Sequence, residues 1–169
     1  TTGATRWSYK ANGWIMSSPA VLENLVAFTS QDGNLYIIDT HTGKRRLDYQ
    51  ISRGGTGSPV FGADKLYMTD GMGLLNAIDW EKKDPPFEKI TRYVKVQLFA
   101  WQILKDLPPQ EGFVWGATLN GEHIVASPAL AWGNVYSVSP AGSLLALDES
   151  TGERLWTFQA NAGLRSSPS

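Results

Sequence analysis

The dipeptide Ser-Pro recurs along the chain, and this repeat limits the possible folds more than any other feature of the sequence. It begins at residues 18, 58, 127 and 167, which gives steps of 40, 69 and 40 residues. A longer string is shared by the two ends, because WSYKANGWIMSSP at 7–19 corresponds to WTFQANAGLRSSP at 156–168. Self-similarity at a fixed period of roughly 20–50 residues indicates a repeat architecture. We therefore expect units of about 40 residues, with 29 further residues inserted in the middle step.

Other residues keep the same phase as the Ser-Pro dipeptide. Three glycines each precede an aspartate by six residues: Gly33, Gly73 and Gly142 precede Asp39, Asp79 and Asp148. Thr-Gly follows at 42–43 and at 151–152. An aspartate at a strand end can accept N–H groups of the following turn, and glycine can supply a positive φ there. These repeated residues are therefore expected to have structural roles.

Each unit contains four short apolar strings that read as strands. The first unit has SSPAVL, LVAFTS, NLYIID and RRLDYQ, and the third has ASPALA, NVYSVS, SLLALD and RLWTFQ. The second unit begins with GSPVFG, KLYMTD and LLNAID. A period of about 40–45 residues with four strands is typical of a β-propeller blade. The expected fold class is all-β: a partial propeller of four-stranded antiparallel blades, about three blades plus flanking strands, formed by residues 1–169 as a single domain. Residues 1–12 are expected to supply one outer strand.

The repeated strings resemble the pyrroloquinoline-quinone-type (PQQ-like) propeller repeats. The resemblance rests on SSPAV, DGNLYIIDTHTG and GSLLALDESTGERLWTF, and it covers the chain except for about residues 81–112. Such repeats occur in quinoprotein dehydrogenases, in the outer-membrane assembly lipoprotein and in other bacterial envelope proteins. The resemblance implies a propeller fold and a periplasmic or extracytoplasmic location, and it leaves the function open because propellers host many functions.

The insertion over residues 84–108 is predicted to be an amphipathic helix between the third and fourth strands of the second repeat. Its apolar residues follow helical spacing: Phe87, Ile90, Val94, Leu98, Trp101 and Leu104. Asp84 is a suitable N-cap, Pro85 and Pro86 fit a first turn, and Pro108–Pro109 would end the helix. A strand through RYVKVQLFAW is the alternative. The helix either packs on its own blades or docks to a partner or a membrane surface through Phe87, Arg92, Lys95 and Trp101.

A second candidate site is a rim of loops on one face of the propeller. Because strands of a blade alternate in direction, loops between blades share a face with loops between second and third strands. The predicted binding residues are Trp14, Arg53, Glu122, His123, Arg165, Asp32 and Asp70. The inserted helix is expected on the opposite face, beside Thr42 and Thr151, while Trp7 and Trp156 are expected to dock between adjacent blades.

Motifs for catalysis and cofactor binding are mostly absent from the sequence. The chain has no Cys, and its two histidines, His41 and His123, lie in different units. We therefore expect no metal site and no cofactor, with PQQ and calcium as the alternative that the resemblance implies. A net charge of -1 gives no reason to expect nucleic acid as a partner.

Two functions are compatible with the sequence. The first is a non-catalytic scaffold or protein-binding module, a fragment or subunit of a larger bacterial envelope assembly. Its partner would be another protein or further copies of the chain that complete the propeller, with possible membrane-surface contact through the helix. The alternative is part of a PQQ-dependent dehydrogenase or of a sugar-active propeller enzyme.

Overall fold

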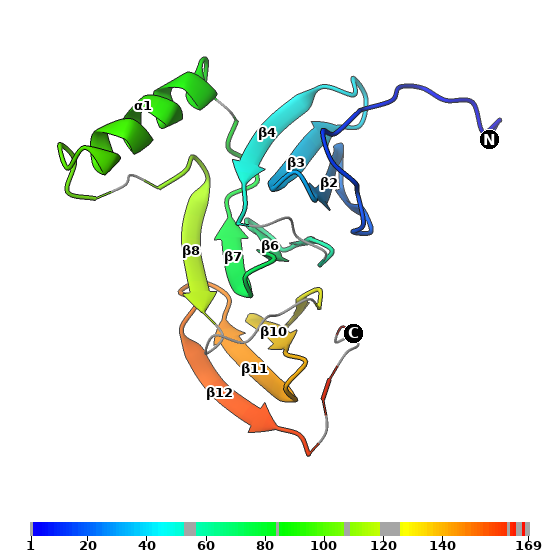
Figure 1. Ribbon diagram of the computed structural model, residues 1–169. Coiled ribbons are helices and arrows are strands. Elements are labelled where there is room, and N and C mark those ends of the chain that lie inside the picture. Colours follow the sequence, from blue (N-terminus) through cyan, green and yellow to red (C-terminus); the bar gives the residue numbers. More distant parts are fainter. Residues whose placement is uncertain are drawn as a thin grey trace.

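The described part of the chain forms three four-stranded sheets, which we call blades 1, 2 and 3 in chain order (Figure 1). The computed structural model describes residues 2–52, 57–83, 85–106, 109–118, 126–161, 163–164 and 167. Neighbouring strands within each blade pair antiparallel, and each sheet keeps the order of the sequence. The predicted fold class, an all-β partial propeller with one inserted helix, is confirmed.

All strands except β8 (Phe113–Thr118) lie within the apolar strings predicted from the repeat; β8, the fourth strand of the second unit, was not among them. Blade 1 consists of β1 (Ala20–Leu22), β2 (Leu25–Ser30), β3 (Asn34–Asp39) and β4 (Arg45–Gln50). Blade 2 consists of β5 (Val60–Phe61), β6 (Leu66–Thr69), β7 (Leu74–Ile78) and β8 (Phe113–Thr118). Blade 3 consists of β9 (Ala129–Ala131), β10 (Asn134–Val138), β11 (Ser143–Asp148) and β12 (Arg154–Gln159).

The repeated aspartates hold the turns between third and fourth strands, as the spacing predicts. In blade 1, Oδ1 of Asp39 accepts the backbone N–H of Thr42 at 2.8 Å. In blade 3, Oδ1 of Asp148 accepts the N–H of Thr151 at 2.9 Å. The next residues, Gly43 and Gly152, have φ values of 67° and 74°. The glycines are needed there because a residue with a Cβ is strained in this region.

Two apolar layers join the blades. Blades 1 and 2 share a buried cluster: Leu25, Ala27, Leu35, Ile37, Leu47, Tyr49, Ile51, Leu66, Met68 and Ile78. Blades 2 and 3 share another: Tyr67, Leu75, Ala77, Trp115, Val135, Leu145 and Leu147. The middle blade is thus covered on both faces, which explains why its strands are apolar on both sides.

A ladder of serine hydrogen bonds also connects successive units. The N–H of Ser18 donates to Oγ of Ser58 at 2.9 Å, and the N–H of Ser58 donates to Oγ of Ser127 at 2.8 Å. The N–H of Ser127 in turn donates to Oγ of Ser167 at 3.0 Å. The repeated Ser-Pro dipeptide therefore sets the position of each unit relative to the next.

A tryptophan from one unit covers the turn glycine of the following unit. The indole of Trp115 lies on Gly152, where an added Cβ would be 2.5 Å from the ring, and its Nε1 donates to the carbonyl of Glu149 at 3.2 Å. Trp7 covers Gly43 in the same way and donates to the carbonyl of Thr40 at 2.6 Å. Trp7 therefore docks on the turn of blade 1 as predicted, but no described blade lies on its other side.

The corresponding prediction for Trp156 is wrong in this structure. Its side chain is 45% exposed, and Phe158 beside it on β12 is 59% exposed. No blade in the described part of the chain lies beyond blade 3 to cover them. The difference arises because a docking tryptophan needs the turn of a following unit.

The N-terminal segment also differs from its prediction, since residues 2–12 form no strand. Trp7 and Tyr9 nevertheless pack on blade 1, where the Tyr9 ring lies 5.5 Å from that of Tyr36 and 6.2 Å from that of Phe28. A strand requires a hydrogen-bonded neighbour, and no described strand pairs with this segment. The side chains of this segment thus pack on blade 1 as expected, but its backbone does not form the predicted strand.

The inserted helix, α1 (Glu88–Ala100), connects β7 to β8 and is shorter than the predicted 84–108. Phe87 is its N-cap, with φ 64° and no side-chain capping bond, while the predicted cap Asp84 lies outside the described residues. The late start is explained by Phe87, whose left-handed backbone at φ 64° and ψ 19° interrupts any right-handed helix before Glu88. The strand alternative for this segment is wrong. No helix among the described residues has the length and apolar character needed to cross a bilayer.

Candidate partner-binding surface

Helix α1 lies beyond the outer strand of blade 1 (Figure 1). It turns most of its apolar residues to solvent. Phe87 is 77% exposed, Ile90 is 63% exposed and Trp101 is 68% exposed. Further exposed apolar residues on or next to the helix are Tyr93, Val94, Phe99 and Ile103. The alternative that this stripe packs on its own blades is therefore wrong for most of its length. We call the four exposed residues of the predicted stripe, Phe87, Ile90, Val94 and Trp101, the α1 apolar surface.

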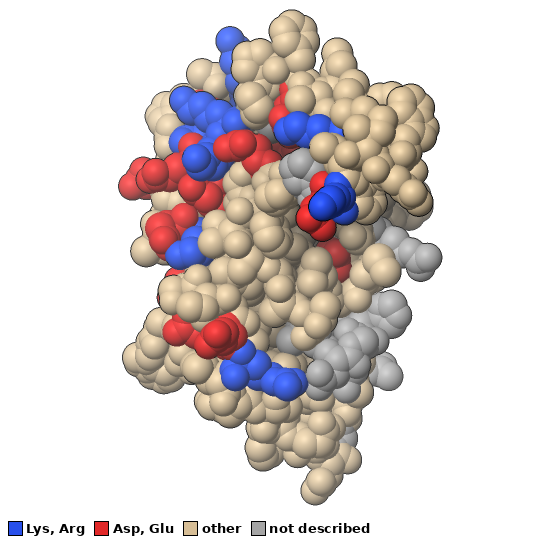
Figure 2. All heavy atoms as spheres, turned by 90° about the vertical axis from the view of Figure 1, so that its left-hand side faces the viewer, with Lys and Arg blue, Asp and Glu red and all other residues tan. Residues whose placement is uncertain are grey.

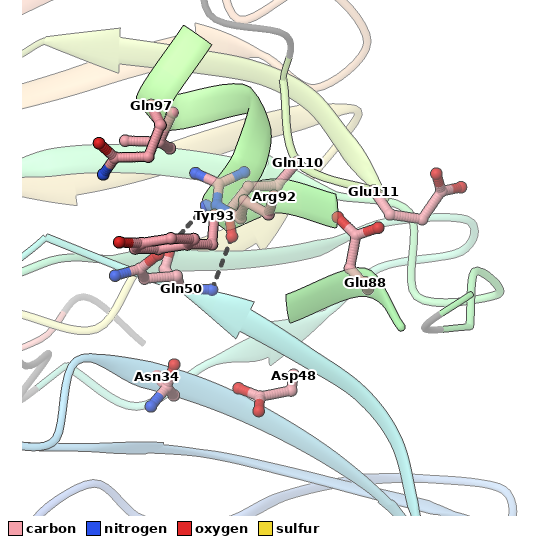
Figure 3. A pocket seen from close by; sticks show the side chains of 10 residues that line it. Asn34, Asp48, Gln50, Glu88, Arg92, Tyr93, Gln97, Gln110 and Glu111 are labelled. Atoms are coloured by element: carbon pink, nitrogen blue, oxygen red, sulfur yellow. Dashed lines mark hydrogen bonds between the residues drawn. The ribbon is translucent and has the colours of Figure 1, made fainter. Parts of the chain in front are cut away.

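The other side of α1 is polar and forms one wall of a pocket of about 460 Å³ beside β4 (Figure 3). The helix contributes Glu88, Arg92, Tyr93, Val96 and Gln97. The opposite wall consists of Asn34, Asp48, Gln50, Gln110 and Glu111. The helix therefore presents hydrogen-bonding side chains to the blade and apolar side chains to solvent.

Arg92 is the central cation of this pocket. It also lines a neighbouring hollow together with Tyr49 and Asp70. Burial lowers the pKa of Arg92 below its ordinary value, and burial raises the pKa of Tyr49 to about 12. At neutral pH the guanidinium is charged and the phenol is neutral. The pocket can therefore offer hydrogen-bond donors and a positive charge from the helix side.

Gln110 attaches the segment after α1 to blade 1. Its Oε1 accepts the backbone N–H of Gln50 at 2.9 Å, and its Nε2 donates to the carbonyl of Gln50 at 2.6 Å. The amide side chain thus pairs with β4 as a neighbouring strand would. This contact joins residues 60 positions apart. Sequence analysis missed the role of Gln110 because no local pattern marks it.

The position of α1 differs from the prediction that it emerges beside Thr42 and Thr151. The helix follows the end of β7, but its pocket includes Asn34 and Gln50, which pair with each other at the far end of β3 and β4. The chain therefore runs back along the outer side of the blades. The helix thus lies along the side of blade 1.

The rim predicted from the loops is only partly described. Trp14 is exposed, and its carbonyl accepts the N–H of Gln31 at 2.9 Å. The neighbouring Asp32 accepts the N–H of Asn12 at 3.0 Å. The structure thus brings Trp14 and Asp32 together. Four predicted rim residues lie outside the described residues: Arg53, Glu122, His123 and Arg165.

The rim aspartates have internal hydrogen bonds. Oδ1 of Asp70 accepts the N–H groups of Met72 and Leu74 at 2.9 and 2.8 Å. Burial would raise the pKa of Asp32, but hydrogen bonds from Tyr36, Asn34, Asn12 and Ser30 outweigh it, and the pKa lies below its ordinary value. Both carboxylates therefore support the turns between second and third strands. A binding role for the rim residues stays a prediction.

The remaining polar surface does not form a metal site within the part of the chain that the structure describes, since no group of three His, Cys, Asp or Glu residues converges there. Figure 2 views the molecule from the side that is on the left in Figure 1, and it shows acidic and basic side chains intermixed. For example, the basic Lys82 and the acidic Glu111 form an ion pair, with Nζ and Oε1 3.9 Å apart. The charged residues around α1 therefore do not make a uniformly basic face.

Comparisons with known proteins agree with this architecture. A family model described as outer membrane protein assembly factor BamB matches residues 1–82 and 109–169, which leaves out α1. No curated protein matches the sequence at a significant level.

Three solved structures illustrate the likeness of fold. BamB from Moraxella catarrhalis is 19% identical with a TM-score of 0.63, over 89% of this chain and 38% of that one. A europium-containing methanol dehydrogenase is 16% identical with a TM-score of 0.65, over 92% of this chain and 27% of that one. The computationally designed Ika4 protein is 16% identical with a TM-score of 0.65, over 93% of this chain and 80% of that one.

These similarities establish the fold but do not decide between a scaffold and an enzyme, because the similar structures include both BamB and a dehydrogenase. The chain spans less than two fifths of the length of the BamB structure. The family match, in contrast, covers well over half of the chain and all three blades. The chain therefore belongs to the BamB family of PQQ-like β-propellers.

Proposed function

We propose that the chain is a non-catalytic scaffold of the bacterial cell envelope and that a partner protein docks on the α1 apolar surface. The observation that carries this proposal is the exposure of Phe87, Ile90 and Trp101 on a helix that the family model does not match. Soluble proteins rarely leave a contiguous apolar patch uncovered unless it is an interaction site.

The spacing of the exposed residues suits docking into a groove. A helix binds an apolar groove through residues three, four and seven positions apart. Phe87, Ile90 and Val94 have this spacing, and Trp101 lies seven positions after Val94. Aromatic side chains dominate the energy of many interfaces, and truncating such an anchor typically costs about 2 kcal/mol or more.

A protein partner is favoured over a membrane surface by the surrounding charge. Binding to anionic lipid is strengthened by a basic polar face opposite the apolar one. Here acidic and basic side chains are intermixed on this side of the molecule (Figure 2), and the polar face of α1 is turned toward blade 1. An apolar groove on a protein requires no such basic face.

The proposal includes a cellular location, which we take from the family. The family model is described by a role in outer membrane protein assembly. We place this chain outside the cytoplasm, in the periplasm or on the envelope, with a protein of the same compartment as its partner. The enzyme alternative, a piece of a quinone-dependent dehydrogenase, is supported only by likeness of fold to enzymes such as the methanol dehydrogenase.

Site-specific cross-linking tests this function. A photoreactive phenylalanine analogue at position 94 should cross-link a protein in envelope preparations, whereas the same group at position 132 should not. Trp132 is the matched control because it is 92% exposed on blade 3, away from α1. The double variant Ile90→Ser, Trp101→Ser should abolish the cross-link.

Two outcomes would contradict the proposal. Equal cross-linking from positions 94 and 132 would show non-specific contact. Flotation of the chain with protein-free anionic vesicles, lost in the Ile90→Ser, Trp101→Ser variant, would assign the α1 apolar surface to a membrane instead.

A further inference from the structure

We propose that the two hollows beside Arg92 form a binding site for a short peptide with free termini. Arg92 and Tyr49 would hold the carboxylate of this peptide, and Glu88 would face its ammonium group. The inference goes beyond the proposed function, since it concerns the polar side of α1 and not the α1 apolar surface. All described residues that line the two hollows lie between positions 34 and 113.

The two hollows have the size of a small-ligand site and meet at Arg92. The first, of about 460 Å³, lies between α1 and β4 (Figure 3). The second, of about 340 Å³, lies between the end of β4 and residues 70–76 of blade 2. Three residues line both hollows: Gln50, Arg92 and Gln110. Small-ligand sites typically enclose roughly 300–1,000 Å³, so one ligand can occupy the first hollow and reach into the second.

Two hydrogen-bond donors at this junction lack a partner. No described residue forms a hydrogen bond or an ion pair with the Arg92 guanidinium or with the Tyr49 hydroxyl. Tyr49 is 5% exposed, so its polar group is largely withdrawn from bulk water. Burial raises the pKa of Tyr49, and the opposing influence of the Arg92 charge shows that the two groups are close. A buried donor without a partner is costly, and a ligand that accepts from it removes this cost.

A carboxylate is the acceptor that suits these two donors. Guanidinium groups bind carboxylates through two parallel hydrogen bonds, and a phenol can donate to the same group. A phosphate would carry more negative charge into a hollow that already contains three carboxylates, those of Asp48, Glu88 and Glu111. The lining therefore favours a ligand with a single carboxylate.

Glu88 provides the complementary charge. It precedes Arg92 by four residues on α1, a spacing at which a glutamate and a cation usually pair. No ion pair between them is present, although both side chains line the first hollow. The other two carboxylates each have a cation already, since Asp48 pairs with Arg45 at 2.8 Å and Glu111 with Lys82 at 3.9 Å. A zwitterion can satisfy Glu88 with its ammonium group and Arg92 with its carboxylate.

The amide side chains of the first hollow favour a peptide over a free amino acid. Gln110 is occupied by the backbone of Gln50. The side-chain amides of Gln50 and Gln97, in contrast, form no hydrogen bond with a described residue. A primary amide both donates and accepts, as a peptide bond does. These two side chains can therefore bind the peptide groups that lie between the charged termini.

Isothermal titration calorimetry of the 169-residue chain with trialanine tests this proposal. We expect one site. Trialanine amide lacks the carboxylate and N-acetyltrialanine lacks the ammonium group, so each should bind at least about tenfold more weakly, as expected for lost hydrogen bonds to charged groups.

Variants assign the termini to their partners. Arg92→Met should weaken trialanine at least about tenfold and should affect trialanine amide much less, because only the former has a carboxylate to lose. Tyr49→Phe removes a single oxygen atom and should also weaken trialanine, with the melting temperature nearly unchanged. Lys95→Met is the control, since it removes a cation of the same helix that lines neither hollow; it should bind like the parent chain.

Three results would overturn the proposal: no binding of trialanine at millimolar concentration, equal affinity for trialanine and either capped peptide, or parent-like binding by Arg92→Met. The proposed function is tested separately. The Ile90→Ser, Trp101→Ser variant should bind trialanine like the parent chain while it loses the cross-link from position 94.

Discussion

Replacing Trp115 with alanine should be the most destabilising single truncation at the interface of blades 2 and 3. The side chain is 8% exposed, lies 5.8 Å from the ring of Tyr67 and covers Gly152. A buried tryptophan removes roughly 150–250 Å² from water. At about 25 cal/mol per Å² this is on the order of 4–6 kcal/mol, an upper value because the unfolded chain is partly compact. Measured truncations of this kind cost about 3–5 kcal/mol, which is the loss we expect here.

Equilibrium urea unfolding of the dilute chain measures this loss. Trp115→Ala should lower the transition midpoint, with the slope unchanged if the native state stays compact. Two further Trp→Ala variants are matched controls, because they make the same substitution at less buried sites. Trp156 is 45% exposed, so Trp156→Ala should lower the free energy of unfolding clearly less than Trp115→Ala does. Trp132 is 92% exposed, so Trp132→Ala should leave the free energy of unfolding almost unchanged. A loss below about 1 kcal/mol for Trp115→Ala would refute the view that blade stacking stabilises this fold.

Three further predictions concern the repeated residues and the cofactor. Hydrogen bonds from Ser150 and Thr151 hold the pKa of Asp148 at about 2, below the unfolded value of about 3.9. Its contribution to stability is therefore present above pH ~4 and lost as the pH falls toward ~2; Asp148→Asn should flatten the acid limb of a plot of urea midpoint against pH. Ser127→Ala should cost about 0.5–1.5 kcal/mol in the same assay, because it removes the acceptor of the Ser58 N–H, and an unchanged midpoint would argue against the serine ladder. Incubation with PQQ and calcium should leave no quinone absorbance on the desalted protein, and retained absorbance would favour the enzyme alternative.

The repeat predicts the blades well because each blade is specified locally. The Asp-Thr-Gly turns of blades 1 and 3 form as their residue types require, with Thr42 and Thr151 donating to the aspartates. In blade 2 the string DWEKK at 79–83 stands where the other blades have Asp-x-x-Thr-Gly, yet Oδ1 of Asp79 still accepts the N–H of Glu81 at 2.9 Å. The N–H of Asp79 donates to the carbonyl of Gly112 at 2.7 Å, beyond the insertion, just as the N–H of Asp39 donates to the carbonyl of Lys44 in blade 1. The strand pairing thus survives an insertion that contributes nothing to it.

The candidate site was harder to predict because it depends on contacts between distant residues. Helical periodicity identifies an apolar stripe, but it does not say whether that stripe faces a blade or solvent. In the structure Arg92 of α1 lines a pocket beside β4, and Gln110 after the helix is bound to Gln50, 60 positions earlier in the chain. The length of the helix was overestimated for a local reason: the left-handed residues Phe87, at φ 64°, and Gln102, at φ 59°, bound it at its start and well before Pro108.

The central claim is that the blades form the scaffold while α1 provides the binding surface, and a loop replacement tests it most directly. Residues 80–112 would be replaced by residues 40–44, the turn that connects the same two strands in blade 1. We predict that the shortened chain keeps its β-sheet circular dichroism, with a melting temperature lower by only a few degrees, and that it no longer competes with the parent chain for the protein cross-linked from position 94. Loss of the folded blades, or undiminished competition by the shortened chain, would contradict the account.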